Sequence, residues 1–184
     1  MNLPLCGDIL IEMTVIASLV VGSNGAASLH GNSRALSTSA DRGRFLERHQ
    51  SASAFIIGKK SALIESYAKC QVPIFVFTRL LEKLDLPHPL MQQITVDRNL
   101  GEITRRIDER IPGDIVVEAG PSLLLALIAE HAVDILELSI SPIEGDGNFI
   151  SVDNLIAAFS IESEINIDGT RLLQCRYNGH ATNS

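Results

Sequence analysis

The stretch Asp114-Ile-Val-Val-Glu-Ala-Gly-Pro-Ser-Leu-Leu-Leu-Ala126 predicts a short buried strand, a tight Gly-Pro turn and the first turn of an apolar helix. A strand that enters a helix through glycine can hold a phosphate, because free backbone N–H groups and the positive end of the helix dipole face the turn. Glu118 stands at the end of the strand beside that turn. The stretch therefore predicts a nucleotide-cofactor site with a substrate-facing acid next to it.

Strand-like and helix-like segments alternate on both sides of this stretch. Runs of β-branched and apolar residues that end at glycine or proline predict buried strands. Segments with polar starts and spaced apolar residues predict helices; Thr38 or Ser39 can cap the first of these, and Asp41 favours its first turn. We expect strands at residues 13–21, 53–57, 73–78, 93–97, 115–118 and 135–140, helices at 37–50, 99–110 and 122–131, a helical turn ending at Tyr67, and loops at 26–36 and 80–90.

The last part of the chain carries a hairpin pattern. Residues 159–167 alternate apolar with polar side chains, Asp168-Gly169 suits a tight turn, and residues 170–177 return. Strands that alternate with helices and then end in a hairpin predict an α/β fold, with a central, mostly parallel twisted sheet flanked by helices and a C-terminal antiparallel hairpin. A length of 184 residues without repeats or low-complexity linkers predicts a single domain over residues 1–184.

The composition argues against several classes of protein. A formal net charge of −7, 4% aromatic residues and no tryptophan do not suit a nucleic-acid-binding face. The apolar run at residues 9–21 contains Glu12, is too short for a membrane span and follows Asp8 rather than basic residues. Three distant cysteines without C-x-x-C spacing suit reduced thiols and a cytoplasmic protein; they are Cys6, Cys70 and Cys175.

Several predicted strands end in glycine, serine, threonine or a basic residue. In an open α/β sheet, ligands bind beyond the carboxyl ends of the strands, so these exits together favour a ligand site. Each exit also has a plain structural explanation: Gly120-Pro121 as a tight turn, Glu118 as a cap or ion-pair partner, and the others as loop geometry or solvated strand ends. The exits lie at residues 22–25, 58–61, 78–79, 118–122 and 145–147.

Common catalytic motifs are absent from the sequence. It contains no G-x-G-x-x-G, no P-loop lysine motif and no G-x-S-x-G nucleophile elbow. The five histidines have no metal-ligand spacing, and there is no H-x-E with P-C-x-x-C. We therefore expect neither a metal site nor a zinc deaminase site.

Three segments resemble the reductase domain of the riboflavin-biosynthesis deaminase/reductase family, a pyrimidine reductase of the dihydrofolate-reductase-like superfamily. Residues 17–25 with Gly31-Asn-Ser33 are similar to the family's S-x-D-G…G-x-S entry. Residues 36–61 resemble its first helix and its A-x-x-x-G-x-x-T strand exit. The most specific segment runs from Val117-Glu-Ala-Gly-Pro-Ser-Leu123 to residues 141–147 and resembles E-[GA]-G-P-[TS]-L…D-E…S-P…G-x-G. The deaminase half has no counterpart, so we expect no deaminase domain.

The resemblance implies that NADPH lies across the carboxyl edge of the sheet. Residues 120–126 would cradle the pyrophosphate, and Ser61 would face the cofactor. Thr78 with Arg79 would suit the adenosine 2′-phosphate, because a guanidinium fork recognises phosphate well. The implied cofactor-binding residues are Ser61, Glu65, Thr78, Arg79, Gly120, Pro121, Ser122, Leu123, Gly145 and Gly147.

The resemblance also implies the reaction. A hydride would pass from the nicotinamide to C1′ of 5-amino-6-(5-phosphoribosylamino)uracil or a close analogue and open the ribose to ribityl. Glu118 would be the catalytic acid, and the substrate-binding residues would be Ser33, His49 and Glu118. The protein would supply position and electrostatics, because the hydride chemistry belongs to the cofactor.

Several family positions differ in this sequence. Asn24 stands where the family has an aspartate, Gly22 replaces its serine, and His49 replaces an arginine at the end of the first helix. The D-P-x-L-T-x-R substrate segment is missing between Tyr67 and Pro73, so two basic groups expected for a substrate phosphate have no evident substitute. Two alternatives therefore stay open: a related reductase acting on another pyrimidine- or pterin-like substrate, and a non-catalytic NADP-binding homologue. The terminal hairpin leaves an edge strand, from which, together with the resemblance, we expect a homodimer.

Overall fold

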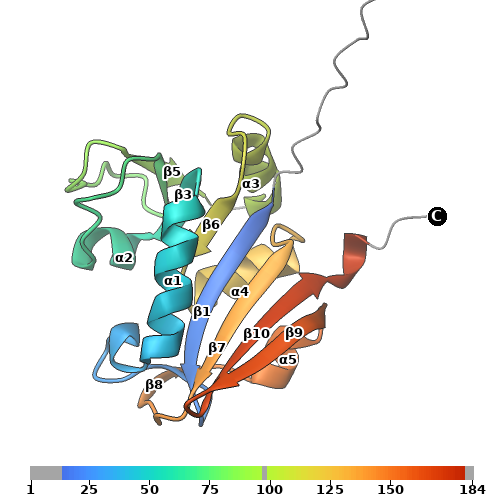
Figure 1. Cartoon of the computed structure of the whole chain (residues 1–184). Helices are drawn as coiled ribbons and strands as arrows, with labels where there is room; N and C mark the ends of the chain where they lie inside the picture. Colours follow the sequence, from blue (N-terminus) through green and yellow to red (C-terminus); the bar gives the residue numbers. More distant parts are fainter. Residues whose placement is uncertain (1–13, 97–98, 181–184) are drawn as a thin grey trace, which may run out of the picture.

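Eight strands form one sheet in the computed structural model, which describes residues 14–96 and 99–180 (Figure 1). Their order across the sheet is β5-β4-β3-β6-β1-β7-β10-β9. The bounds of these strands are β1 Val15–Gly22, β3 Ala54–Gly58, β4 Ile74–Thr78, β5 Met91–Thr95, β6 Ile115–Glu118, β7 Ile135–Ser141, β9 Phe159–Ile167 and β10 Thr170–Tyr177.

The pairing is parallel from β5 to β7 and antiparallel at the other edge. Strand β1 lies between β6 and β7, with Ala17 opposite Val117 on one side and Leu136 on the other. Strand β10 runs antiparallel to β7 and to β9. In the turn between β9 and β10, Asp168 and Gly169 have φ values of 50° and 82°, the positive values that a two-residue type I′ turn requires. The predicted fold class and the predicted bounds of the hairpin are confirmed.

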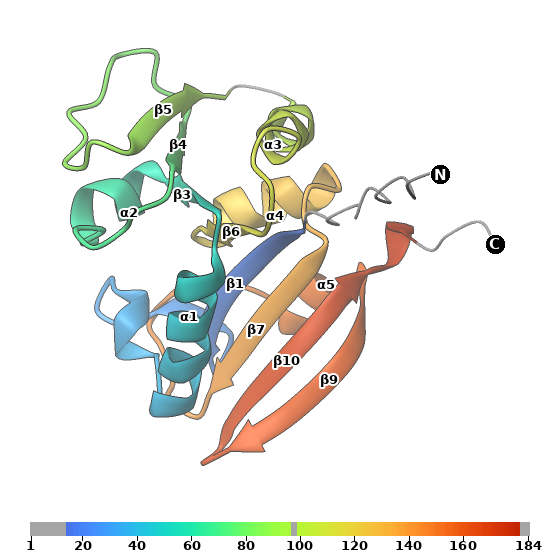
Figure 2. The same ribbon diagram turned by 45° about the horizontal axis from the view of Figure 1, so that its top comes forward.

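Helices cover both faces of this sheet (Figure 2). Helices α1 (Ser39–Ser51) and α2 (Lys59–Ile64) lie on one face. Helices α3 (Leu100–Asp108), α4 (Pro121–Ala129) and α5 (Val152–Ile156) pack on the other. Within the described residues, no helix combines the length and the apolar character needed to span a membrane.

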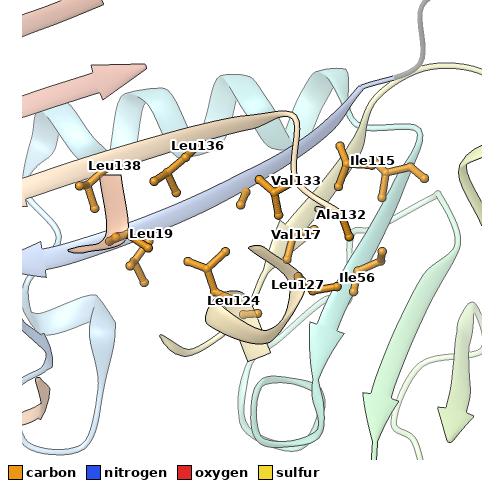
Figure 3. Packing of buried hydrophobic residues seen from close by; sticks show 14 of the residues in the cluster. Leu19, Ile56, Ile115, Val117, Leu124, Leu127, Ala132, Val133, Leu136 and Leu138 are labelled. Carbon is orange, nitrogen blue, oxygen red and sulfur yellow. The ribbon is translucent and has the colours of Figure 1, made fainter. Parts of the chain in front are cut away.

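Helix α4 supplies the main apolar contact with the sheet (Figure 3). Leu124 and Leu127 are fully buried against residues of β1, β6 and β7, including Val117 and Leu136. A helix this apolar is stable in water only when most of it is covered, and the sheet covers it from the first turn. This apolar helix thereby fixes the position of the turn that precedes it.

The opposite face is held by a buried polar layer beneath α1. The guanidinium of Arg44 donates to the Leu173 carbonyl at 2.9 Å and to Ser139 Oγ at 2.8 Å. One turn later, Arg48 forms an ion pair with Glu137, which is 3% exposed. Burying Glu137 without this cation would be strongly unfavourable, so the pair fixes the carboxyl-terminal half of α1 over β7.

Four short elements, two strands, a 3₁₀ turn and a short helix, were not predicted. Residues 26–36, expected to be a loop, contain strand β2 (Ala26–Ser28) and the 3₁₀ turn η1 (Ser33–Ala35). Strand β2 pairs with β8 (Gly147–Phe149) in a second, two-stranded sheet. Strands of three residues carry too little periodicity to be recognised, and the one-turn helix α5 is marked only by its Ser151 cap.

Other predictions differ by a few residues. The strand predicted at 93–97 begins at Met91 and ends at Thr95, and α2 ends at Ile64 instead of Tyr67. Four parts of these predictions lie outside the described residues: residue 13 of the first predicted strand, residue 97, residues 9–13 of the apolar run at 9–21, and Cys6. Cys70 and Cys175, which are described, form no disulfide.

The packing of α4 predicts a difference between two leucines on that helix. Leu127→Ala should lower the free energy of unfolding by about 2–5 kcal/mol, because the side chain is fully buried and its loss leaves a cavity. Leu125→Ala is the matched control: that side chain is 43% exposed, and its loss should cost less than about 1 kcal/mol. Urea unfolding followed by circular dichroism measures both, and equal losses would contradict the packing of α4 on the sheet.

Candidate functional site

The carboxyl ends of β3, β4 and β6 meet at one edge of the sheet. Ile57 lies opposite Glu118, and Gly58 lies opposite Phe77, the residue before Thr78. Parallel pairing places these exits side by side, as the sequence predicted. They border the N-terminus of α4 and the start of α2.

Glu118, the predicted catalytic acid, is held by two neighbouring side chains. The hydroxyl of Tyr67 donates to Oε2 at 3.1 Å, and Nε2 of His49 makes an ion-pair contact with Oε1. The Glu118 side chain is 10% exposed. The histidine contact lacks the alignment of a regular hydrogen bond, so it is an electrostatic contact whenever the ring carries a proton on both nitrogens.

His49 reaches Glu118 from the last turn of α1, between two aromatic rings. Its ring centroid is 4.3 Å from that of Phe45 and 4.5 Å from that of Phe55. Phe55 is 1% exposed and belongs to the cluster of buried residues between β3, β4 and α2. Packing on both sides restricts the ring, and the ion pair of Arg48 one residue earlier holds the helix turn that carries it.

Two further polar groups share this environment. Glu65 is an exposed residue, but partial burial of its carboxyl raises its pKa, and the charge of Glu118 raises it further, while the nearby Ser61 hydroxyl and His49 act in the opposite direction. Burial also raises the pKa of the Tyr67 phenol, with the Glu118 charge as the next cause, so Tyr67 stays a proton donor to that carboxylate. The candidate site is therefore a cluster in which one histidine faces two carboxylates.

The N-terminus of α4 lies next to this cluster and is open. Gly120 is the N-cap, with no side-chain hydrogen bond to the cap, and Pro121 is the first helical residue. Gly120 and Ser122 are exposed, and no atom lies within 4 Å of the place where a Cβ on Gly120 would stand. A Cβ on Gly58 would lie 3.9 Å from Leu123, so the exit of β3 borders the first turn of α4. Backbone N–H groups at such a terminus can receive an anion.

Thr78 and Arg79 stand at the next exit, on β4. Thr78 is 7% exposed, and its Oγ1 accepts a hydrogen bond from the Leu80 amide at 3.1 Å. Arg79 is exposed, and no ion pair of its guanidinium is found within the described residues. Thr78 therefore stabilises the turn after β4, and Arg79 places an exposed positive charge beside that turn.

The exits on the other side of β1 serve a structural purpose. Gly145 packs against β2, where a Cβ would come within 2.5 Å of the Ser28 carbonyl, and a Cβ on Gly147 would lie 2.8 Å from the Ser28 hydroxyl. Asn24 donates to the Gly145 carbonyl at 2.9 Å and accepts from the Gly145 amide at 3.1 Å. These contacts explain both glycines and the asparagine without a ligand, so a cofactor role for Gly145 and Gly147 stays a prediction.

Ser33 lies on η1, on the side of α2. It is exposed, and Lys60 Nζ donates to the Gly31 carbonyl at 3.3 Å, which ties this loop to the exit of β3. Of the residues predicted for the site, the structure brings together Glu118, His49, Ser61 and Glu65 around one cluster, with residues 120–123 beside it.

Sequence reasoning missed the groups that hold Glu118 in place. Tyr67 was interpreted only as the end of a helical turn, although it is one of two tyrosines in the sequence. A buried tyrosine needs a partner for its hydroxyl, and this requirement was the available signal. The contact of Phe45 with His49 follows the i, i+4 spacing of one helix, whereas the contact of Phe55 has no local pattern because Phe55 lies on β3.

Comparisons with known proteins match the fold of this chain and not its sequence. No protein-family model and no curated protein matches the sequence. Solved structures do match. A pyrimidine reductase-like protein from Corynebacterium diphtheriae has a TM-score of 0.68 and 15% identity over 89% of this chain and 91% of its own. Dihydrofolate reductase from Enterococcus faecalis, complexed with NADP(H), has a TM-score of 0.64 and 15% identity over 90% of this chain and 96% of its own.

The chain has the dihydrofolate-reductase-like fold. A diaminohydroxyphosphoribosylaminopyrimidine deaminase/5-amino-6-(5-phosphoribosylamino)uracil reductase from Thermotoga maritima shares it, with a TM-score of 0.67 and 17% identity over 89% of this chain. This chain covers 56% of that protein's length. In this dihydrofolate-reductase-like chain, the cluster of Glu118 and His49 stands at the carboxyl edge of the sheet, where open α/β sheets bind ligands.

The raised pKa of Glu65 predicts a pH-dependent stability. A carboxyl whose pKa is higher in the folded than in the unfolded state ionises more readily on unfolding, so its charge lowers stability once the pH exceeds the unfolded value. Glu65→Gln should therefore raise Tm at neutral pH, and the difference should disappear as the pH falls below about 4.

The control for this experiment is Glu82→Gln, at an exposed glutamate in the loop before β5. It should change Tm little across the same pH range. Thermal unfolding at a series of pH values measures both variants, and a Glu65→Gln protein that is less stable than the wild type at neutral pH would contradict the environment described for Glu65.

Proposed function

We propose that the protein is a cytoplasmic NADPH-dependent reductase of a pyrimidine- or pterin-like compound, with 5-amino-6-(5-phosphoribosylamino)uracil as the leading substrate. The observation that carries this proposal is the open N-terminus of α4 directly beside the buried Glu118–His49 pair. The fold supports it, since the Enterococcus faecalis protein is a dihydrofolate reductase complexed with NADP(H) and the Thermotoga maritima protein is named as a uracil reductase.

The residues at the edge fit a dinucleotide phosphate. In the proposal, the backbone of residues 120–123 holds the pyrophosphate, because Gly120 leaves space for close approach and the helix terminus attracts negative charge. Arg79, exposed beside Thr78, holds the 2′-phosphate. Ser61 and Glu65, on and after α2, border the same edge. NADPH supplies the hydride when bound.

The protein's own contribution is position and charge. Glu118 is fixed by Tyr67 and His49, so it can present a stable negative charge without reorganisation. A protonated His49 can supply a proton to a substrate nitrogen or oxygen near the cluster, with Glu118 stabilising the charged ring. Ser33 lies on the loop that Lys60 ties to this edge and would complete the substrate side.

A specific observation favours the alternative of a non-catalytic NADP-binding protein. The position of the family's arginine is taken by His49, and that ring lies in ion-pair contact with Oε1 of Glu118, whose Oε2 accepts from Tyr67. A substrate phosphate would therefore lack one counter-charge at this point, a loss worth on the order of 1.5–3 kcal/mol for a charged hydrogen bond. A related reductase whose substrate lacks the phosphate would not need this counter-charge, so its substrate binding would not be weakened.

The decisive assay is the oxidation of NADPH, followed by its absorbance, in the presence of 5-amino-6-(5-phosphoribosylamino)uracil. The proposal predicts turnover. Turnover only with a phosphate-free pyrimidine or pterin would favour the related reductase, and saturable NADPH binding without turnover on any of these compounds would favour the binding protein.

Replacing the acid tests the role of Glu118. Glu118→Gln should lower kcat by at least about tenfold and leave the Kd for NADPH within about twofold, because the charge acts on the substrate and not on the cofactor. Glu164→Gln, an exposed glutamate of β9, makes the same chemical change away from the site and should alter neither value. Unchanged turnover in Glu118→Gln would remove this residue from the mechanism.

Replacing the exposed arginine tests the 2′-phosphate site. Arg79→Ala should weaken NADPH binding by about tenfold or more and NADH binding by less than about twofold, because only NADPH carries the 2′-phosphate. The matched control is Arg110→Ala, an exposed arginine after α3 with the same change of charge. Fluorescence titration measures all four affinities, and equal losses for the two cofactors would refute the assignment.

The exposed edge of the hairpin supports a homodimer as a further part of the proposal. Strand β9 has one neighbour in the sheet, and Ile161, Ile165 and Ile167 on it are each more than 40% exposed. Unpaired backbone groups next to apolar side chains favour association with a second strand.

A further inference from the structure

A cavity of about 300 Å³ lies at the opposite edge of the sheet, where the parallel strands begin. Its walls come from α3, from the carboxyl end of α4 and from the starts of β1 and β7. Val15 and Asp134 mark this amino edge, whereas the candidate reductase site stands at the carboxyl edge. The proposed function uses none of the residues of this cavity.

Most charged groups of the cavity wall have partners. Glu102 pairs with Arg105 at 2.9 Å and with Arg106 at 2.9 Å. Glu130 accepts a hydrogen bond from the Gly101 amide at 2.8 Å and thereby caps the start of α3. These side chains stabilise α3 and link its first turn to the end of α4.

Two groups on α3 are left over. Thr104 is 1% exposed, and its hydroxyl has no hydrogen-bond partner among the described residues. The same is true of the buried Oδ1 of Asp108, four residues later on the same helix face. Both residues line the cavity. A buried hydroxyl and a buried carboxylate oxygen without partners are rare in folded proteins, and each calls for a donor from a ligand or water.

The charge around these atoms favours a cation. Asp134, whose Oδ2 accepts from the Val15 amide at 2.7 Å, faces the cavity together with Asp108. Partial burial raises the pKa of the Asp108 carboxyl, and the charges of Asp134 and Glu109 raise it further, so a cation bound beside it would favour its charged form. The negative end of the α4 dipole points to the same place.

The described residues offer no arrangement for a metal ion. No group of three or more histidine, cysteine, aspartate or glutamate side chains in residues 14–96 and 99–180 could hold one. The space instead corresponds to about ten water molecules at ~30 Å³ each, which is the size of a small organic ligand. A ligand with hydrogen-bond donors can satisfy both the carboxylate and the hydroxyl, and a positive charge on it would pair with the carboxylate.

We propose that this cavity binds a small organic cation, a primary ammonium or guanidinium compound whose N–H groups donate to Asp108 and Thr104. The Asp108 carboxylate attracts the positive charge of the ligand. The buried Thr104 hydroxyl favours a cation that carries hydrogen-bond donors. Because the cavity and the candidate reductase site lie at opposite edges of the sheet, binding here is independent of the proposed reaction.

The test is a titration of the full chain with n-butylammonium, followed by ¹⁵N–¹H spectra. Saturable shifts of the Thr104 and Asp108 amides are expected, with much smaller shifts from 1-butanol, which lacks the charge, and from tetramethylammonium, which lacks the donors. Asp108→Asn should weaken binding about tenfold or more, and Thr104→Val about threefold or more. Glu109→Gln removes the same charge from the neighbouring residue, which does not line the cavity, and should change the affinity less than about twofold.

Several results would overturn the proposal. These are the absence of saturable shifts at α3, equal losses in Asp108→Asn and Glu109→Gln, and tetramethylammonium binding as well as n-butylammonium. Saturation by Mg²⁺ with displacement of the amine would do the same, since it would identify a metal site. Asp108→Asn removes an unfavourable buried charge, so it should fold and raise Tm, and the near-isosteric Thr104→Val provides a second variant. The affinity for NADPH should be the same in all of these variants, which separates this test from that of the proposed function.

Discussion

The parallel pairing of β6 with strands on both sides is the interaction on which the rest of the structure depends. Its residues Ile115 to Val117 are fully buried between β3 and β1, and its last residue is Glu118. Because neighbouring strands run in the same direction, their carboxyl ends come to one edge, and α4 can begin directly beyond it. The site is thus a consequence of the register of four residues.

The two faces of the sheet place the two halves of the site by different physical means. On one face, Leu124 and Leu127 hold α4 by hydrophobic burial, which fixes the helix N-terminus. On the other face, Arg44 and Arg48 hold α1 by buried hydrogen bonds and an ion pair, which fixes His49. Loss of a single partner in these polar contacts would leave a buried charge, so they hold the turn of α1 that carries His49 in one position.

Local patterns predicted the central part of the fold from the sequence. The strand at 115–118, the apolar helix after it and the terminal hairpin each carry a strong signal within a few neighbouring residues. The order of these segments was enough for the fold class, and the strand exits were enough to indicate the edge at which Glu118 lies. The same local reasoning identified the residues of the α4 N-terminus.

Contacts between distant residues could not be predicted in this way. The Tyr67–Glu118 hydrogen bond joins positions 51 residues apart, and the Arg48–Glu137 pair joins positions 89 apart. Neither residue pair has a periodic signature. At Gly145 and Gly147 the close packing of β2 accounts for the glycines themselves, and their predicted cofactor role stays a prediction. Chemistry that depends on such contacts, including that of the cavity at Thr104 and Asp108, becomes visible only in three dimensions.

The central claim is that the N-terminus of α4 binds the pyrophosphate of NADPH. A titration of the isotope-labelled protein with NADPH, observed through its backbone amides, tests it most directly. We predict saturable shifts that are largest at Gly120, Ser122 and Leu123 and extend to the exit of β3 at Gly58. The absence of saturable shifts, or shifts confined to the amino edge of the sheet, would contradict it.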